Sequence, residues 1–305
     1  MKNKIVVIGS SNIDYIMKMS RLPHVGETIT DAVFMQTYGG KGANQAVGAA
    51  RAGGDVYFVN CVGDDDASHR MVEQFRSEGI HTDFVFQEKG TACGAALVMI
   101  GEQGTNYLSV APGANYRLMP EHIDRADELI STAAIVVLQY EILPDTLKYV
   151  LNVCDRHKTR VLWNCAPARE FDRSYLTKVN ILVVNETEAG MLSGIVIKEE
   201  GSVEPAAKEL LRLGCETVII TLGARGSYIA ASGVCDWIPA FKVDVVDTTG
   251  AGDVYCGCLA VALSEGKTLT ESARFASAAA AISVTRLGAQ PSVPCRDEID
   301  RFLKT

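Results

Sequence analysis

The sequence of 305 residues lacks an excess of positive charge: 29 lysines and arginines stand against 37 aspartates and glutamates, giving a net charge of −8. Nucleic acids and anionic membranes require a basic surface, so neither is expected as a main partner. The net charge does not exclude binding of a small anionic ligand, since backbone N–H groups can hold a phosphate inside an acidic protein.

Long apolar runs are also missing. No stretch approaches the ~18 consecutive apolar residues of a membrane span, and the apolar run 5–8 is too short for a secretory signal. Nine cysteines in a chain of this length do not make a disulfide scaffold, and the odd number leaves at least one thiol free. We therefore expect a protein of the reducing cytoplasm, with mostly buried thiols.

Several cofactor and catalytic motifs are absent. Gly9 is not followed by the further glycines of a dinucleotide fingerprint, which disfavours a dehydrogenase. Residues 266–268 match the end of a phosphate-binding P-loop, but Val261 stands where its first glycine belongs, so they are interpreted as a helix-ending turn. Cys256 and Cys258 lie in an apolar stretch, where buried structural thiols are commoner than metal ligands.

Short apolar, β-branched runs alternate with helical patterns along the chain. Helical spacing is clear in Met71, Val72 and Phe75, and between Pro205 and Gly214. Runs of this length are typical of strands buried on both faces of a parallel sheet. The expected strands are 5–8, 56–61, 134–138, 160–164, 181–185, 217–221 and 227–231. The alternation predicts a doubly wound α/β fold.

Two stretches break this alternation. Residues 15–38 and 91–110 each have the pattern of strands and turns, and neither stretch has the pattern of a helix. They predict a small β appendage, built from two separate insertions into a single domain that spans residues 1–305.

The strongest chemical signal is the stretch 247–253, Asp-Thr-Thr-Gly-Ala-Gly-Asp, which leads into an apolar helical run. Gly250 and Gly252 allow close approach of a ligand, and the free N–H groups of a helix start favour an anion. An acidic group beside an anion site suits a base that removes a proton from an attacking hydroxyl. The alternative is that Asp253 is only a helix-start residue.

Three further groups of residues each carry a structural alternative. Residues 39–44, Gly-Gly-Lys-Gly-Ala-Asn, are either an anion-binding loop or a glycine turn before a helix. Asn12 and Asp14 follow the first strand, where they suit a polyol or form an Asx turn. Residues 185–188, Asn-Glu-Thr-Glu, can order Mg²⁺ through water or cap a helix.

Together these motifs resemble the ribokinase family of sugar kinases, within the wider ribokinase/PfkB superfamily. The resemblance covers essentially the whole chain, with the motifs in the family's order. It is carried by residues 9–14, 23–28, 39–46, 164–170, 185–188, 221–223, 247–253 and 288–294.

The resemblance implies transfer of the γ-phosphoryl group of ATP to the 5-hydroxyl of D-ribose, with Mg²⁺ as the metal. It assigns the catalytic base to Asp253 and the anion hole to Gly250, Ala251 and Gly252. The positions that match sugar-holding residues, besides Asp253, are Asn12, Asp14, Gly40, Lys41, Asn44 and Glu141. Those that match the nucleotide region are Asn185, Glu188, Thr221, Gly223, Gly226, Ala251, Gly252 and Ser277.

The resemblance further implies activation by K⁺ and a lid formed by the two β insertions, which often also forms a homodimer interface. The residues at the positions of the ion are Asp247, Thr249, Ser283, Arg286, Gly288 and Ser292. Ser277 departs from the Asn or His that relatives often carry near the adenine.

Two alternatives to ribose phosphorylation follow. The same chemistry can act on another acceptor, such as 2-deoxyribose, a ketohexose or a nucleoside. Asn12 favours ribose, because an apolar residue tends to replace it in deoxyribokinase-like relatives. The second alternative is a non-catalytic sugar sensor, which the intact run 250–253 disfavours, since a sensor needs no base beside an anion hole.

Overall fold

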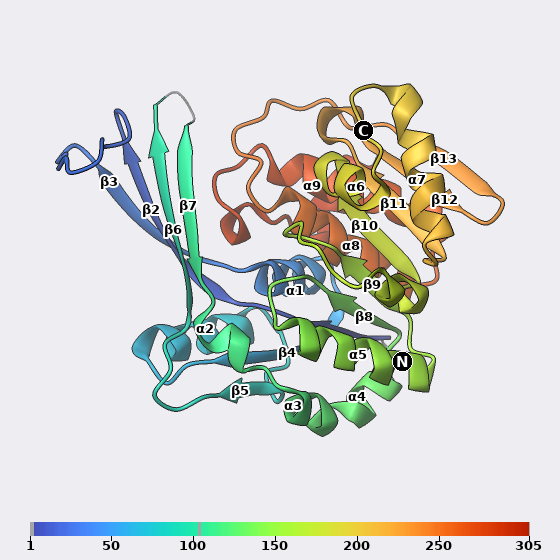
Figure 1. The fold of residues 1–305 in the computed structure, drawn as a ribbon, viewed down its shortest axis with the longest axis horizontal. Helices are drawn as coiled ribbons and strands as arrows, with labels where there is room; N and C mark the ends of the chain where they lie inside the picture. The colour runs from blue at the N-terminus through green and yellow to red at the C-terminus, as the bar shows by residue number, and fades with distance from the viewer. Residues whose placement is uncertain (1–2, 103–104, 305) are drawn as a thin grey trace.

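The computed structural model describes residues 3–102 and 105–304 and contains two β-sheets (Figure 1). The larger sheet has nine strands in the order β13-β12-β11-β10-β9-β8-β1-β4-β5. All neighbours pair in parallel except β11–β12 and β12–β13. The bounds are β1 Lys4–Ile8, β4 Asp55–Val62, β5 Val85–Gln87, β8 Ile135–Leu138, β9 Val161–Asn164, β10 Ile181–Asn185, β11 Thr217–Thr221, β12 Ser227–Ala231 and β13 Val234–Ile238.

Helices cover both faces of this sheet, because successive strand residues point to opposite sides. Ile5 and Val7 face one core cluster, and Val6 and Ile8 face the other. The first face is covered by α1 Lys41–Arg51, α2 Asp66–Ser77, α8 Ala251–Ser264, α9 Leu269–Ser283 and α10 Arg296–Phe302. The second is covered by α3 Pro120–Arg125, α4 Asp127–Ser131, α5 Pro144–His157, α6 Glu186–Ser193 and α7 Val203–Arg212. The predicted doubly wound α/β fold is confirmed.

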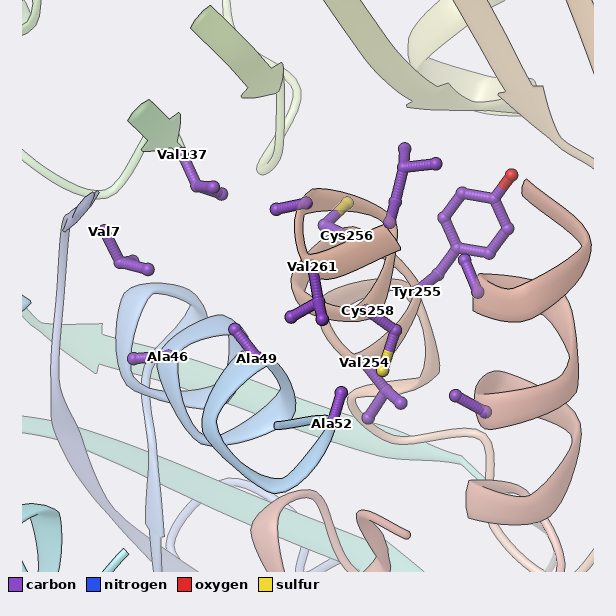
Figure 2. Close-up of a cluster of buried hydrophobic side chains, with 14 of the residues drawn as sticks. Val7, Ala46, Ala49, Ala52, Val137, Val254, Tyr255, Cys256, Cys258 and Val261 are labelled. Carbon is purple, nitrogen blue, oxygen red and sulfur yellow. The ribbon is translucent and has the colours of Figure 1, made fainter. Parts of the chain in front are cut away.

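The first core cluster brings α1 against α8 (Figure 2), where the Cys258 thiol donates to the Gly48 carbonyl at 3.7 Å. Gly257 allows this approach, because a Cβ there would lie 2.4 Å from the carbonyl oxygen of Gln45. The two helices carry the residues of the predicted base and of the loop 39–44, so their packing fixes one against the other.

A second, four-stranded sheet, called the small sheet below, projects from one edge of the body (Figure 1). Its order is β3-β2-β6-β7, with β2 and β6 parallel and the outer pairs antiparallel. The bounds are β2 Asn12–Met19, β3 Val33–Gly39, β6 Gly94–Gly101 and β7 Asn106–Ala111. The predicted insertions 15–38 and 91–110 contain most of these residues; 103 and 104 lie outside the described ones.

The structure decides several local alternatives. Asn12 and Asp14 lie in β2, hydrogen-bonded on both sides to β3 and β6, so the Asx-turn interpretation was wrong. Gly266 has a φ of +82° in the turn between α8 and α9, which confirms the helix-ending turn. All nine cysteines are free and seven are buried, Cys256 and Cys258 among them. No helix within residues 3–102 and 105–304 is long and apolar enough to cross a membrane.

Candidate active site

Four predicted site residues, together with Asn164 of the 164–170 motif, lie at the carboxyl ends of five neighbouring strands, which is where open α/β sheets bind ligands. Asn12 follows β1, Glu141 follows β8, Asn164 ends β9, Asn185 ends β10 and Thr221 ends β11. Parallel pairing brings these five ends to one edge of the large sheet.

Asp253 lies in the first turn of α8, only 4% exposed. Gly250 begins this helix in the left-handed conformation, with a φ of +76°, and a Cβ there would be 3.0 Å from that of Ala289. The first N–H groups of a helix have no intrahelical partner and favour negative charge. Of these first N–H groups, the one of Ala251 is already engaged, because it donates to the carbonyl of Thr248 at 3.2 Å.

Both oxygens of the Asp253 carboxylate accept hydrogen bonds from α1. Asn44 donates through Nδ2 to Oδ2, and Gln45 donates through Nε2 to Oδ1, each at 3.0 Å. Gln45 was not predicted from the sequence, although it directly follows the 39–44 motif. Asn164, which also contacts Gln45, was quoted only as part of the family resemblance.

Glu141 and Lys41 meet at the start of α1. The Glu141 carboxylate accepts hydrogen bonds from Ser10 Oγ at 2.5 Å and from the Lys41 N–H at 3.0 Å, so it caps the helix. The negative charge of Asp253 raises the pKa of the Lys41 ammonium above its usual value, and Glu141 and Glu188 add to this effect. Lys41 is therefore a firmly charged cation among carboxylates.

Asn12 is oriented by a residue that the sequence did not indicate. Asn115 donates through Nδ2 to Asn12 Oδ1 at 2.8 Å and to the Ser11 carbonyl at 3.1 Å. Asn115 Oδ1 accepts the Ser11 N–H at 2.9 Å, which fixes which end of its amide faces Asn12. With its oxygen engaged, Asn12 has its amide nitrogen left to donate.

Asp14 lies beside Gly39, where a Cβ would come within 2.1 Å of the carboxylate. Burial raises the pKa of Asp14 to about 6, and the negative charges of Glu141 and Asp253 add to that rise. The three carboxylates thus form one acidic group near the end of β1.

Two cavities open at this edge of the sheet. The larger, about 200 Å³, is lined by Lys41, Asn164, Ala166, Val183, Asn185, Glu188, Thr221, Gly250, Gly252 and Asp253. The smaller, about 90 Å³, is lined by Asn12, Val110, Pro112, Asn115, Tyr116, Glu141, Pro167 and Arg169. Val110 belongs to β7, so the small sheet contributes to the wall of the smaller cavity.

Asn185 and Glu188 form a reciprocal cap of α6. Asn185 Oδ1 accepts the Glu188 N–H at 2.8 Å, and Glu188 Oε2 accepts the Asn185 N–H at 2.9 Å. The predicted helix cap is therefore present, while both residues also line the larger cavity. Burial raises the pKa of Glu188, and the neighbouring Glu186 pairs with Arg225.

The remaining nucleotide-region residues lie beyond the cavity. Gly223 belongs to η4 Gly223–Arg225, and Gly226 follows with a φ of +94°. A Cβ at Gly226 would lie 2.0 Å from the Ile238 carbonyl oxygen, which gives this glycine a packing role. Ser277 is buried in α9 and lines neither cavity among the described residues.

The six residues predicted to surround K⁺ come from two loops, from the last residue of α9, Ser283, and from the turn η5 Gln290–Ser292. Asp247 joins the two loops: its Oδ1 accepts from Thr249 Oγ1 at 2.6 Å and its Oδ2 accepts the Gly288 N–H at 2.9 Å. Although burial opposes them, these hydrogen bonds keep the pKa of Asp247 below its usual value. Arg286 is paired with Glu298, and the Ser283 and Ser292 hydroxyls donate to Ala280 and Ala289 carbonyls.

Comparison with known proteins identifies relatives along the full chain. The sequence profile described as "pfkB family carbohydrate kinase" matches residues 2–296. A ribokinase of Haemophilus influenzae is 36% identical and covers 100% of this chain and 99% of its own. A deoxyribokinase of Salmonella typhi is 35% identical over 98% of each chain. The Arabidopsis thaliana ribokinase structure with ribose and ATP superimposes with a TM-score of 0.94, at 33% identity and 100% coverage of both chains.

Proposed function

The chain belongs to the pfkB family of carbohydrate kinases, and from this premise we propose that it transfers the γ-phosphoryl group of ATP to the 5-hydroxyl of D-ribose. The observation that carries the proposal is the placement of Asp253. Its buried carboxylate lies at the start of α8, on a cavity that it shares with Lys41, Gly250 and Gly252. A proton acceptor, an anion-favouring helix start and a cation therefore meet in one space.

In the proposed reaction, an oxygen of the Asp253 side chain takes the proton of the sugar's 5-hydroxyl as that hydroxyl oxygen bonds to the γ-phosphorus. The bond from this phosphorus to the β,γ-bridging oxygen breaks, and ADP leaves. Lys41 and the N–H groups around Gly252 stabilise the negative charge on the transferred group. Asp253 then returns its proton to water. Positioning and charge stabilisation dominate such reactions, because little covalent chemistry is asked of the protein.

Ribose is favoured as acceptor by the donor that Asn12 offers. Asn115 occupies the Asn12 oxygen, so the Asn12 nitrogen is left to donate to a sugar hydroxyl at the smaller cavity. An acceptor that lacks this hydroxyl leaves a buried amide unpaired, which costs about 1–3 kcal/mol. The deoxyribokinase relative makes 2-deoxyribose the second candidate, and a ketohexose or a nucleoside remains a further one.

The proposed Mg²⁺ would be held through water by Glu188 and the phosphates, since Mg²⁺ binds one or two carboxylates and keeps several waters. Glu188 fits, because only its Oε2 is engaged with Asn185 and it lines the larger cavity. When bound, the ion would neutralise phosphate charge. For K⁺, both Asp247 oxygens accept hydrogen bonds and the Arg286 side chain is paired. The proposed ligands are therefore largely backbone carbonyls.

We propose that the small sheet acts as a lid over the sugar and joins two copies of the chain. Its face with Asp14 also carries an apolar row of Met35, Ile16, Val98 and Leu108 across the four strands. The opposite face carries a second row of Phe34, Met17, Met99 and Tyr107. Phe34 and Tyr107 are 57% and 65% exposed. A sheet that is apolar on both faces needs a cover on each.

The proposed setting is the reducing cytoplasm, supported by nine free cysteines, of which seven are buried.

The test is ADP release by the purified protein with Mg²⁺-ATP, comparing D-ribose, 2-deoxyribose, a ketohexose and a nucleoside, with and without KCl. We expect turnover that depends on ribose and rises with K⁺. Equal kcat/KM for ribose and 2-deoxyribose would contradict the role given to Asn12. Sugar binding without turnover on any acceptor would instead support the sensor.

A further inference from the structure

The hydrogen-bonding partners of Asp253 form a connected amide network that reaches back into the large sheet. Gln45, fully buried with 0% exposure, lines neither cavity, so it acts on the reaction only through the side chains it touches. Its amide contacts three of them: Asp253 Oδ1 at 3.0 Å, Asn164 Oδ1 at 3.1 Å and Gln139 Nε2 at 2.7 Å.

One backbone carbonyl sets the direction of the hydrogen bonds that Asn164, Gln45 and Gln139 make to one another. The Val183 carbonyl of β10 only accepts, so Asn164 must turn its Nδ2 toward it, at 3.2 Å. Asn164 Oδ1 therefore faces Gln45, and Gln45 must present Nε2 to both Asn164 and Asp253. Gln45 Oε1 is then left to accept from Gln139 Nε2. A reversed Gln45 amide would set its oxygen against two acceptors and its nitrogen against a donor.

Gln139 is itself confined on its other side. Its Oε1 lies 1.8 Å from where a Cβ on Gly9 would stand, so only glycine at position 9 leaves room for it. This oxygen is buried without a hydrogen-bond partner. An unpaired buried amide oxygen costs free energy, while the nitrogen of the same Gln139 amide donates to Gln45.

We propose that Gln45, held by Gln139 and Asn164, is a positioning residue that aims the Asp253 carboxylate at the sugar hydroxyl. The inference rests on the proposed function of Asp253 as the base. Asn44 and Gln45 each donate to one oxygen of this carboxylate. They also prevent rotation about the bond that carries the carboxylate, so that its remaining lone pairs point into the larger cavity.

The first variants are Gln45→Met, which keeps the side-chain length and removes the donor, and Gln45→Glu, which replaces the donor with an acceptor. Loss of a hydrogen bond to a charged group predicts a fall in kcat of about 10- to 100-fold for Gln45→Met. KM for the sugar and for ATP should change by less than about threefold, since Gln45 lines neither cavity.

The pH profile separates positioning from general damage. In Gln45→Glu, a donor to Asp253 exists only while the new carboxyl is protonated, so the kcat profile should change shape. A merely structural defect lowers kcat by one factor at every pH. Gln74→Met in α2 is the matched control, because its amide contacts Glu78 instead of Asp253.

A double-mutant cycle tests the path through Gln139. Gln139→Met should lower kcat in the native background and have no further effect on kcat in Gln45→Met. Thermal unfolding and ATP binding confirm that each variant is folded. Unchanged kcat in a folded Gln45→Met, or effects of the two changes that simply multiply, would overturn the inference. If the native protein turns over no acceptor, it is the proposed function that fails.

Discussion

At the scale of single residues, Asp14 has opposite effects on stability and on the proposed function. Its buried carboxylate lowers the stability of the fold above pH 6, and the same carboxylate is proposed to bind the sugar. Burial and the charges of Glu141 and Asp253 raise its pKa to about 6, so between about pH 4 and 6 the folded chain holds a proton that the unfolded chain has lost. Folding stability from this group is therefore lost as pH rises through 6, by at most about 3 kcal/mol.

We expect Asp14→Asn to be more stable than the native protein at pH 8, by about 1–3 kcal/mol, and to lose that advantage toward pH 4. KM for ribose should rise, because the carboxylate no longer accepts from the sugar. Urea unfolding at pH 5 and pH 8 measures the first effect. Asp31→Asn, an exposed position whose pKa is lowered by Ser20, should show no such gain. An equal stability difference at both pH values would refute the assignment.

Asp253→Asn tests the base itself. General-base catalysis contributes roughly 10²–10⁴-fold, so kcat should fall by about that factor, while calorimetry should show ribose binding largely kept. The amide would also turn an N–H₂ group toward Asn44 or Gln45, which are donors. A near-native kcat would remove Asp253 from this role.

Some of the residues that bear on this chemistry could be selected from the sequence, and others were found only in the structure. Asp253, Asn12 and Asp14 stand in short motifs beside strand ends or helix starts, so pattern and resemblance were enough to select them. Gln45, Gln139 and Asn115 are polar residues whose function depends on three-dimensional partners about 94 to 208 residues away. No local pattern marks them, and an Asn or Gln is as compatible with an exposed surface.

At the scale of elements, all seven strands predicted for the large sheet are present, because each is a short apolar run buried on both faces. Two others were missed. β5 has only three residues, and β13 is an edge strand whose residues are mostly exposed. The start of β2 was also missed, because Asn12 and Asp14 are polar and are ordered by pairing with β3 and β6.

The packing of α1 on α8 gives a prediction at this scale. A Cβ at Gly257 would lie 2.4 Å from the Gln45 carbonyl oxygen and 2.8 Å from the Ala49 nitrogen, so Gly257→Ala must push the helices apart. Overpacking of this kind costs about 1–3 kcal/mol. Because α1 carries the partners of Asp253, kcat should fall together with the melting temperature.

Gly201→Ala is the matched control for this change, since a Cβ there meets nothing within 4 Å. It should leave both the melting temperature and kcat near native values. A Gly257→Ala protein that is destabilised but fully active would show that the base tolerates movement of α1.

At the scale of the whole molecule, the small sheet stands apart from the body and meets it chiefly at the ends of its strands (Figure 1). Asn12 and Asp14 lie at the start of β2, next to the site, while the apolar rows lie farther along the strands. A hinge at this junction would let the sheet close over the sugar and exclude water, which otherwise competes for the phosphoryl group.

The dimer follows from the same geometry. If closure covers the face with Asp14, the row Phe34, Met17, Met99 and Tyr107 still needs a partner, and a second copy of the sheet matches it in size and polarity. We expect the native protein to sediment as a dimer and Phe34→Asp to sediment as a monomer, because a charge at this interface would be buried unpaired.

Val25→Asp, at a fully exposed site of the same insertion, should remain dimeric. A monomeric native protein, or a dimer that survives Phe34→Asp, would place the interface elsewhere. If the variant is monomeric but keeps its KM for ribose, dimerisation and closure over the sugar are independent properties of the sheet.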